Sequence, residues 1–205
     1  GYKSYFIKEY FANYFLHMSD VTFDMSSNEM TVHKKRAESW KVTLVDTGLN
    51  SMTGGRLRKV KKYLADDNAF CFTYGDGVSD VNISSLIKFH KKHGKQATVT
   101  GVRPPGRFGT LDVENEQVNS FLEKPKGDGG MINGGFFVLN TSVIDLIQSD
   151  STIWEQEPLE ELSKQRQLMC FEHNGFWQPM DTLRDKVFLE KLWTSGKAPW
   201  KTWNK

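Results

Sequence analysis

A glycine-flanked aspartate at the end of an apolar run constrains this chain more than any other feature. The run Ala69-Phe70-Cys71-Phe72-Thr73 predicts a buried strand, and Tyr74-Gly75-Asp76-Gly77 follows it directly. A strand that ends in this way delivers one carboxylate, that of Asp76, to the edge of a sheet without crowding side chains. In open α/β folds this carboxyl edge is where ligands bind. By itself the pattern favours an ordinary turn, so its meaning depends on the rest of the chain.

Three later stretches add groups that suit a ligand at this edge. Asp181 is a second carboxylate, and Lys124, fixed by the proline after it, can serve as a point charge for a phosphate. Asn133 can bond hydroxyl groups, and the glycines after it allow close backbone approach. With Asp76, this set is typical of a site that handles a phosphate with a divalent metal. The stretches are Phe121-Leu122-Glu123-Lys124-Pro125, Ile132-Asn133-Gly134-Gly135-Phe136-Phe137 and Trp177-Gln178-Pro179-Met180-Asp181.

The bulk composition indicates one ordinary globular domain, which we place at residues 1–205. A chain of 205 residues with 38% apolar residues can bury a sizeable core. Its 27 basic and 25 acidic residues nearly balance, so charge gives no case for nucleic-acid binding. No apolar stretch is long enough to cross a membrane, and we expect no membrane partner. The strand-like surroundings of Cys71 and Cys170 predict buried thiols in a reducing compartment, with a single disulfide as the open alternative.

The hydrophobic pattern predicts an α/β fold with a mixed, mainly parallel sheet flanked by helices. In the first half, strands alternate with helices, which implies parallel pairing and right-handed crossovers. From Pro104 onward a hairpin-type pair, a further strand and three helices follow. We expect a helix with Asp80 as its N-cap. The predicted strands are 21–23, 30–32, 41–46, 70–73, 97–102, 108–113, 117–122 and 136–139, and the predicted helices are 5–18, 54–63, 80–90, 142–147, 158–165 and one after 181.

Each candidate residue also has an ordinary structural explanation. Asp181 precedes a helix and suits an N-cap, while Lys124 can be a surface lysine beside a turn. Asn133-Gly134-Gly135 is a good turn sequence, and Glu123 can either accept hydrogen bonds from a sugar or pair with a cation. Thr53-Gly54-Gly55-Arg56 opens a helix that can admit a flat base or receive a phosphate. The acids of Glu155-Gln156-Glu157-Pro158 suit a helix N-terminus.

Several other chemistries lack their sequence signatures. The chain has no Cys-x-x-Cys pair, and its five histidines show no ligand spacing, which argues against zinc. No serine lies within Gly-x-Ser-x-Gly, the usual elbow of α/β hydrolases. Neither the P-loop nor the Rossmann glycine fingerprint is present.

With these residues in hand, the chain resembles the cytidylyl-transferring branch of the sugar-nucleotide pyrophosphorylase family over essentially all of its length. Gly-Asp-Gly and Glu-Lys-Pro are shared across the wider family, whereas Met-Thr-Gly-Gly-Arg and Phe-Trp-Gln-Pro-Met-Asp-Thr are specific to this branch. The stretches that carry the resemblance are Gly1-Tyr2-Lys3, Val45-Asp46-Thr47-Gly48, Met52 to Leu57, Tyr74 to Gly77, Pro105 to Gly109, Glu123 to Gly129, Ile132 to Phe137 and Gly175 to Thr182.

The resemblance implies a Rossmann-like nucleotidyltransferase fold and a reaction that joins CTP and glucose 1-phosphate to give CDP-glucose and pyrophosphate, with Mg²⁺. It implies catalytic roles for Asp76, Lys124 and Asp181, with the two aspartates on the metal and the lysine on the sugar phosphate. Gly109, Glu123, Asn133 and Gly134 match positions around the sugar, and Thr53, Gly54, Arg56 and Gly75 match positions around the nucleotide.

One departure from the family is large. Its members begin with a strand and a glycine-rich loop that carries Gly-Thr-Arg and, further on, Lys-Pro; this sequence does not contain that unit. We therefore expect a fragment with weak nucleotide binding and little turnover. Two alternatives stay open: a related enzyme that uses UTP or dTTP, and a non-catalytic domain that keeps only a sugar-phosphate site.

The resemblance also implies a cellular setting. By resemblance, we expect this protein to act in the cytoplasm of a bacterium that makes deoxysugars for surface polysaccharide, and homo-oligomers are usual in the family. The aromatic tail of Trp193, Trp200 and Trp203 needs a packing partner. That partner is either a neighbouring subunit or this chain itself.

Overall fold

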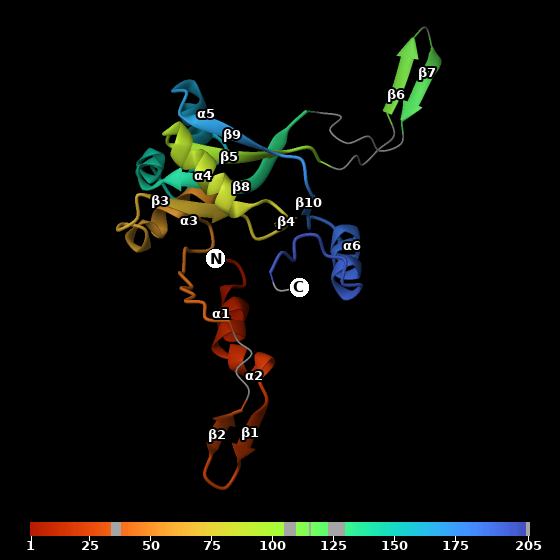
Figure 1. The fold of residues 1–205 in the computed structure, drawn as a ribbon. Coiled ribbons are helices and arrows are strands. Elements are labelled where there is room, and N and C mark those ends of the chain that lie inside the picture. Colours follow the sequence, from red (N-terminus) through yellow and green to blue (C-terminus); the bar gives the residue numbers. More distant parts are fainter. Residues whose placement is uncertain (34–37, 105–109, 115, 123–129, 204–205) are drawn as a thin grey trace.

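A four-stranded mixed sheet organises the computed structural model (Figure 1), which describes residues 1–33, 38–104, 110–114, 116–122 and 130–203. The helices are α1 (Ser4–Ala12), α2 (Tyr14–Met18), α3 (Thr53–Lys59), α4 (Ile83–His93), α5 (Glu157–Lys164) and α6 (Leu183–Thr194), with short 3-10 helices at Lys61–Tyr63 and Thr141–Leu146. The strands are β1 (Val21–Asp24), β2 (Glu29–Val32), β3 (Ala69–Thr73), β4 (Gly77–Ser79), β5 (Ala97–Val102), β6 (Thr110–Glu114), β7 (Gln117–Leu122), β8 (Ile132–Asn140), β9 (Leu168–His173) and β10 (Trp177–Pro179).

The main sheet has the order β3-β8-β5-β9. Strand β8 is antiparallel to both of its neighbours, and β5 and β9 are parallel. Three strands therefore run in one direction and β8 in the other, so the sheet is mixed as predicted, but two of its three strand pairings are antiparallel. The parallel pairing expected among the strands of the first half is not found between β3 and β5, because β8 lies between them. With most of its residues buried or half-buried, β8 suits an inner position flanked by two strands.

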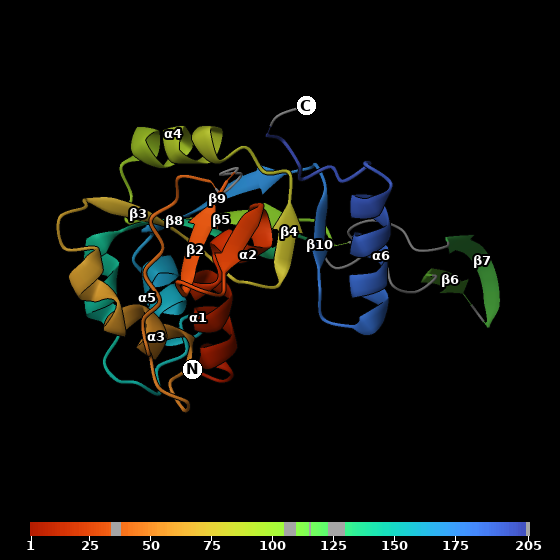
Figure 2. The ribbon, with the colours of Figure 1, turned by 90° about the horizontal axis from the view of Figure 1, so that it is seen from below.

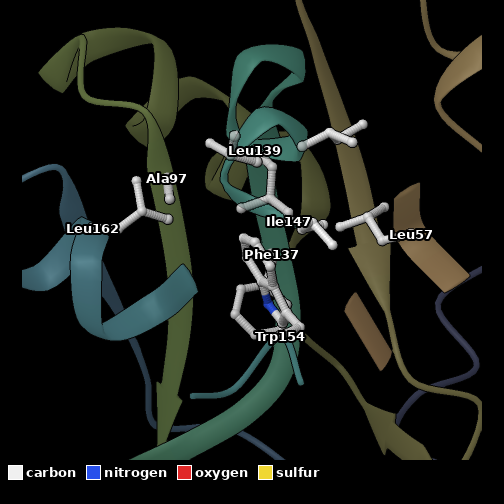
Figure 3. Close-up of a cluster of buried hydrophobic side chains, with 9 residues drawn as sticks. Leu57, Ala97, Phe137, Leu139, Ile147, Trp154 and Leu162 are labelled. Carbon is white, nitrogen blue, oxygen red and sulfur yellow. The ribbon is translucent and has the colours of Figure 1, made fainter. Parts of the chain in front are cut away.

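One face of the sheet carries the main hydrophobic core. Side chains alternate along the strands, so Ala97 of β5 and Phe137 and Leu139 of β8 lie on the same face. They pack with Leu57 of α3 and Leu162 of α5, with Trp154 of the segment before α5, and with the short helix at 141–146 (Figure 3). Trp154 is fully buried and lies edge-on to Phe137. Apolar residues from segments far apart in the sequence thus pack into one core.

The opposite face of the sheet is covered by α4, which lies on the other side from α3 and α5 (Figure 2). Its contact with the sheet is partly polar: His90 and His93 of α4 both hydrogen-bond Thr98 Oγ1 of β5, at 2.9 and 2.7 Å. His90 also reaches Asn140 Oδ1 of β8 at 3.0 Å. Because these buried polar side chains have hydrogen-bond partners, they do not destabilise the fold as unpaired buried polar groups would.

The N-terminal elements form an arm that extends away from the sheet in Figure 1. Neither α1 nor α2 contains a buried residue. The predicted helix over 5–18 is present but is interrupted at Asn13, which leaves the helical conformation at φ −100° and ψ 13°. The predicted hairpin follows, with Val21 opposite Val32. The expected strand at 41–46 is wrong, because no described strand pairs with these largely exposed residues.

Other differences concern helix ends and cysteines. Asn82, not Asp80, caps α4, since its Oδ1 accepts the N–H of Ser85 at 2.8 Å. Thr182, not Asp181, caps α6, in a reciprocal capping box with Asp185. Both cysteines are exposed and free rather than buried, because their strands leave these side chains outside the core.

Several expectations hold within the described residues. The strands β3, β5 and β8 and the β6–β7 hairpin lie where they are predicted, with at most four residues of difference at any end. The helix expected over 54–63 divides into α3 and a 3-10 turn, and the one over 142–147 is itself a 3-10 helix. Of the helices that the structure describes, none has the length and apolar character to cross a bilayer.

Candidate active site

A short antiparallel ribbon of β4 and β10 brings the two predicted metal ligands together. Trp177 lies opposite Ser79 and Pro179 opposite Gly77. Beyond the last pair, the N–H of Met180 donates to the carbonyl oxygen of Asp76 at 2.7 Å. Asp181 is the next residue, so two aspartates that are far apart in the sequence lie at the same end of one ribbon. The glycine-flanked position of Asp76 directly after β3 agrees with its prediction from the sequence.

This pair fits the demands of Mg²⁺. Asp76 and Asp181 are both exposed, so their side chains lie at a solvent-accessible surface. Mg²⁺ prefers oxygen ligands and is often held by one or two carboxylates, with water and substrate phosphates completing the shell. The described residues contain no group of three or more His, Cys, Asp or Glu arranged to hold a metal. The arrangement therefore suits a cation that a substrate helps to bind rather than a closed structural metal site.

The first half of β8 forms the floor beside this ribbon. The N–H of Tyr74, directly after β3, donates to the carbonyl of Gly135 at 3.3 Å, and Asn133 Nδ2 donates to the Tyr74 hydroxyl at 3.4 Å. Trp177 Nε1 of β10 donates to the carbonyl of Gly134 at 2.8 Å. The candidate sugar residues Asn133 and Gly134 thus lie next to the loop that carries Asp76.

The turn interpretation of Asn133-Gly134-Gly135 is wrong, because all three residues belong to β8. The glycines meet two separate needs. Gly135 has φ +78°, and a Cβ there would lie 2.7 Å from the Tyr74 ring. A Cβ on Gly134 would lie 2.7 Å from Val102 Cγ1 and 3.0 Å from the Thr100 carbonyl oxygen. The register of β5 and β8 also shifts between Val99 and Gly101, so the strand is irregular where it faces the site.

A hydrogen-bonded network links the two predicted halves of the site. Glu155 Oε2 accepts from Thr53 Oγ1 at 2.7 Å, and Glu155 Oε1 accepts from the Tyr74 hydroxyl, which in turn meets Asn133. Burial, and then the hydrogen bond to Glu155, raises the pKa of Tyr74 well above its usual value. The phenol therefore keeps its proton at neutral pH and acts as a donor. Thr53, predicted on the nucleotide side, and Asn133, predicted on the sugar side, are thus held by the same pair of side chains, Tyr74 and Glu155.

Sequence reasoning missed the roles of Tyr74 and Glu155. Local sequence predicts Glu155 only as an acid before a helix and Tyr74 only as part of a strand end. No local pattern could reveal their contact, because it joins the end of β3 to the segment before α5. The one sequence signal is that Tyr74, which has a polar hydroxyl, directly follows the apolar run 69–73.

The start of α3 shows that the candidate nucleotide residue Gly54 and its neighbour Gly55 have packing roles. A Cβ on Gly54 would lie 2.8 Å from the Thr152 carbonyl oxygen, and one on Gly55 would collide with the backbone of Asp150. The Met52 N–H donates to the Asp150 carbonyl oxygen at 2.8 Å, and the Gly55 N–H donates to the Thr152 carbonyl oxygen at 3.2 Å. These donors are thus already used, which weakens the interpretation of this helix end as a phosphate site.

The Arg56 guanidinium holds the preceding loop. It donates to Thr47 Oγ1 at 2.7 Å and to the carbonyl oxygens of Gly48 and Leu49 at 3.0 and 3.2 Å. Its part in nucleotide binding therefore stays a prediction. By contrast, a Cβ on Gly75 would meet nothing within 4 Å, so the backbone beside Asp76 is open to a ligand. The remaining candidates, Gly109, Glu123 and Lys124, lie outside the described residues.

Comparisons with known proteins identify the family of this chain. Residues 5–183 match the family model described as nucleotidyl transferase. The chain is 71% identical over 203 residues to a glucose-1-phosphate cytidylyltransferase of Salmonella typhi, covering 99% of this chain and 79% of that protein. It is 41% identical over 204 residues to a Bacillus subtilis protein assigned the same activity, again covering 99% and 79%.

A solved structure shares the fold. It is that of a Bacillus anthracis protein assigned as a glucose-1-phosphate thymidylyltransferase, in complex with sucrose. The TM-score is 0.54 at 14% sequence identity, over 77% of this chain and 65% of that one. At this identity the likeness concerns the arrangement of helices and strands alone.

Proposed function

This chain belongs to the nucleotidyl transferase family, and within it to the glucose-1-phosphate cytidylyltransferases, and from that premise we propose that it forms CDP-glucose and pyrophosphate from CTP and glucose 1-phosphate. The observation that carries this proposal is the 71% identity over 99% of the chain. The meeting of Asp76 and Asp181 at one end of the β4–β10 ribbon supports it independently.

The reaction is an in-line displacement at the α-phosphorus of CTP. A phosphate oxygen of glucose 1-phosphate forms the new P–O bond as the bond to the pyrophosphate oxygen breaks. No covalent bond to the protein is needed, so catalysis consists of positioning and charge neutralisation. A bound Mg²⁺ supplies positive charge that offsets the charge on the phosphate oxygens. Asp76 and Asp181 would hold it through their carboxylate oxygens.

The remaining residues would bind and orient the two substrates. Asn133 Oδ1 accepts the N–H of Gly135 at 2.8 Å, which fixes the amide so that a second Nδ2 hydrogen can meet a sugar hydroxyl. Lys124 would neutralise the phosphate of glucose 1-phosphate, with Glu123 and the backbone of Gly109 and Gly134 around the sugar. Thr53, Gly54, Arg56 and Gly75 would line the nucleotide side, where Gly75 leaves open space.

We extend the proposal to the cellular setting. A single domain over residues 1–205 of this sequence would work in the cytoplasm as part of a homo-oligomer that supplies activated glucose for surface polysaccharides. The aromatic tail is compatible with a subunit contact, because Trp193 and Trp203 are 50% and 54% exposed. Trp200 instead packs against Phe176 within the chain, with 5.4 Å between ring centroids.

Pyrophosphate release from CTP, UTP and dTTP with glucose 1-phosphate and Mg²⁺ tests the proposal. We expect the product of the complete reading frame to use CTP at least about tenfold better than UTP or dTTP in kcat/KM, a difference of about 1.4 kcal/mol in barrier height. A preference for UTP or dTTP would replace the base assignment. If no pyrophosphate is released with any of the three nucleotides but glucose 1-phosphate still binds, a non-catalytic sugar-phosphate domain would be favoured.

Substitution of Lys124 locates the sugar phosphate. Lys124→Ala removes the proposed point charge, so KM for glucose 1-phosphate is expected to rise more than KM for CTP. The reverse order would move the lysine to the nucleotide side. Lys62→Ala, on the surface near α3, is the matched control and is expected to change neither value.

A further inference from the structure

The β4–β10 ribbon is too small to hold its own position. Each strand has three residues, and within the described chain the ribbon pairs with no third strand. One of its positions is Pro179, which cannot donate a backbone hydrogen bond. An isolated two-stranded ribbon is at best marginally stable in water. Contacts with the rest of the molecule must therefore fix the ribbon, and with it the carboxylates that it carries.

One such contact lies at the end of the ribbon away from Asp76. Asp80 Oδ1 accepts the N–H of Phe176 at 2.7 Å and lies 2.9 Å from His173 Nε2. His173 is the last residue of β9, where it pairs with Val102 of β5 in the main sheet. Asp80 follows β4 directly, and its N–H donates to the Phe176 carbonyl oxygen at 3.2 Å. Asp80 thus ties the ribbon to the main sheet.

The neighbours of the His173 ring indicate which ring nitrogen carries a hydrogen at this contact. Its Nε2 faces two acceptors, Asp80 Oδ1 and the Phe176 carbonyl oxygen at 3.2 Å, so Nε2 carries a hydrogen. The His173 side chain is only 10% exposed and that of Asp80 30% exposed. Limited exposure keeps water from competing strongly for these bonds, and a hydrogen bond with a charged partner is about twice as strong as a neutral one.

Gly175 gives this contact the space it needs. A Cβ at this position would lie 2.7 Å from His173 Cε1 and 2.9 Å from its Nε2, and it would collide with Asp80 Oδ1. Gly175 is not among the glycines with positive φ, so its lack of a side chain matters for space rather than for backbone conformation. The loop between β9 and β10 is therefore shaped around the Asp80–His173 pair.

The pair is too far from the carboxylates to share a metal ion with them. Asp80 lies four residues beyond Asp76 along β4, or about 13 Å at the usual strand rise. Its influence must pass through the ribbon. At the near end, the bond from Met180 N–H to the Asp76 carbonyl oxygen couples the two strands. A change in the position of the far end would therefore alter the spacing of Asp76 and Asp181.

We propose that Asp80 and His173 form a clamp, spaced by Gly175, that positions the β4–β10 ribbon so that Asp76 and Asp181 can share one divalent cation. The clamp residues are positioning residues: they act through the ribbon and do not bind the metal ion. This proposal rests on the metal site of the proposed function and names the residues that support it. Trp177 also links the ribbon to the main sheet, because its Nε1 donates a hydrogen bond to the Gly134 carbonyl oxygen.

The test measures binding of Mn²⁺ alone, by electron paramagnetic resonance of the free ion and by water-proton relaxation, in the full-length protein. His173→Phe keeps a ring of similar size but removes the donor, and we expect it to weaken Mn²⁺ binding roughly tenfold, the low end for loss of a residue that orients metal ligands. His173→Gln can place an amide N–H near the former Nε2, so we expect binding within about threefold of the parent protein.

Two further variants keep the test decisive. Gly175→Ala disturbs the clamp without altering either partner and should reproduce the loss, which covers the case in which His173→Phe does not fold. Glu190→Gln breaks the exposed Lys186–Glu190 pair of α6, 3.4 Å apart, and should leave Mn²⁺ binding unchanged. Thermal unfolding of each variant identifies the folded samples.

Asp76→Asn, measured in parallel, separates failure of the clamp from failure of the metal site. If Asp76→Asn weakens Mn²⁺ binding and the folded clamp variants do not, the clamp is overturned and the metal site stands. If none of them changes Mn²⁺ binding, both assignments are wrong. If all weaken it but no nucleotide supports turnover, the clamp stands and the proposed reaction fails.

Discussion

The sheet body and the N-terminal arm contain helices of similar length with opposite burial. Helix α5 has eight residues and buries Pro158 and Leu162, whereas α1 has nine residues and buries none. Both have apolar residues at helical spacing, yet Tyr5 and Phe6 of α1 are 69% and 62% exposed. Apolar periodicity thus predicts that a helix forms, but the apolar face stabilises the fold only where it packs against another element.

The largest effect is expected in the core of the sheet body. Trp154→Ala removes a fully buried indole that packs against Phe72 and Phe137. The free energy of unfolding should fall by about 3–5 kcal/mol, as for other aromatic truncations in cores. Denaturant unfolding, monitored by far-UV circular dichroism, measures the loss.

Trp154→Phe is the matched control for this substitution. Trp154 Nε1 is buried without a hydrogen-bond partner in the described part of the chain, so phenylalanine loses volume but no hydrogen bond. Its cost should be clearly smaller than that of alanine. Equal costs for both variants would mean that the indole does not fill the core as described.

A smaller loss is expected where α3 meets the loop before Trp154. Gly55→Ala would drive a methyl group into the backbone of Asp150, which cannot move as a flexible side chain can. We expect about 1–3 kcal/mol of destabilisation, the usual range for overpacking. Gly75→Ala, where a Cβ meets nothing within 4 Å, should cost much less in the same unfolding assay. A neutral Gly55→Ala would contradict the close packing of α3.

The stability of the body should also depend on pH through the histidines between α4 and the sheet. Burial, and then the neighbouring His90 and Lys95, lowers the pKa of His93 below its ordinary 6.5. The Nδ1 of His93 also accepts the N–H of Lys95 at 2.8 Å, a bond that protonation of Nδ1 would break. The unfolded chain therefore binds this proton more readily than the folded one.

Stability from His93 should be complete above pH 6.5 and fall as the pH drops below that value, toward the lower pKa of the folded state. One proton limits the slope to about 1.4 kcal/mol per pH unit. Unfolding free energies measured between pH 7.5 and 5 test this, with His93→Asn expected to flatten the profile because the amide does not titrate in this range, while its oxygen can still accept from the Lys95 N–H. His17→Asn, in the exposed arm, should leave the profile unchanged.

The smallest effect is expected in the arm itself. Tyr5→Ala should change the free energy of unfolding by less than about 0.5 kcal/mol, as is usual for exposed positions. A loss of more than 2 kcal/mol in the full-length protein would show that this face of α1 is covered there. That outcome would remove the contrast between the arm and the sheet body.

The sequence predicted local elements better than their connections. The apolar runs that became β3, β5 and β8 were visible, because each is a short buried stretch bounded by turns. The position of β8 between β3 and β5 was not, since strand order depends on pairing between distant segments. The expected strand at 41–46 failed for the same reason: alternation cannot supply a neighbouring strand.

In the candidate site, too, the sequence predicts single residues better than the contacts between distant residues. Asp76 was visible from its glycine-flanked position after β3, and its meeting with Asp181 required the β4–β10 pairing that no local pattern encodes. Glu155 and His173 were not identified, because each acts through a contact with a residue far along the chain. Resemblance to a family selected residues that spacing alone left open.

The most direct test of this account is the Mg²⁺-dependent release of pyrophosphate from CTP and glucose 1-phosphate by the full-length protein and its Asp76→Asn variant. We predict a loss of at least about 100-fold in kcat/KM, or about 2.7 kcal/mol in barrier height, with an unchanged unfolding midpoint. The midpoint should hold because the Asp76 side chain is exposed and the bond to Met180 uses its backbone. Normal turnover by a folded Asp76→Asn protein would remove Asp76, and the metal site at this end of the ribbon, from the mechanism.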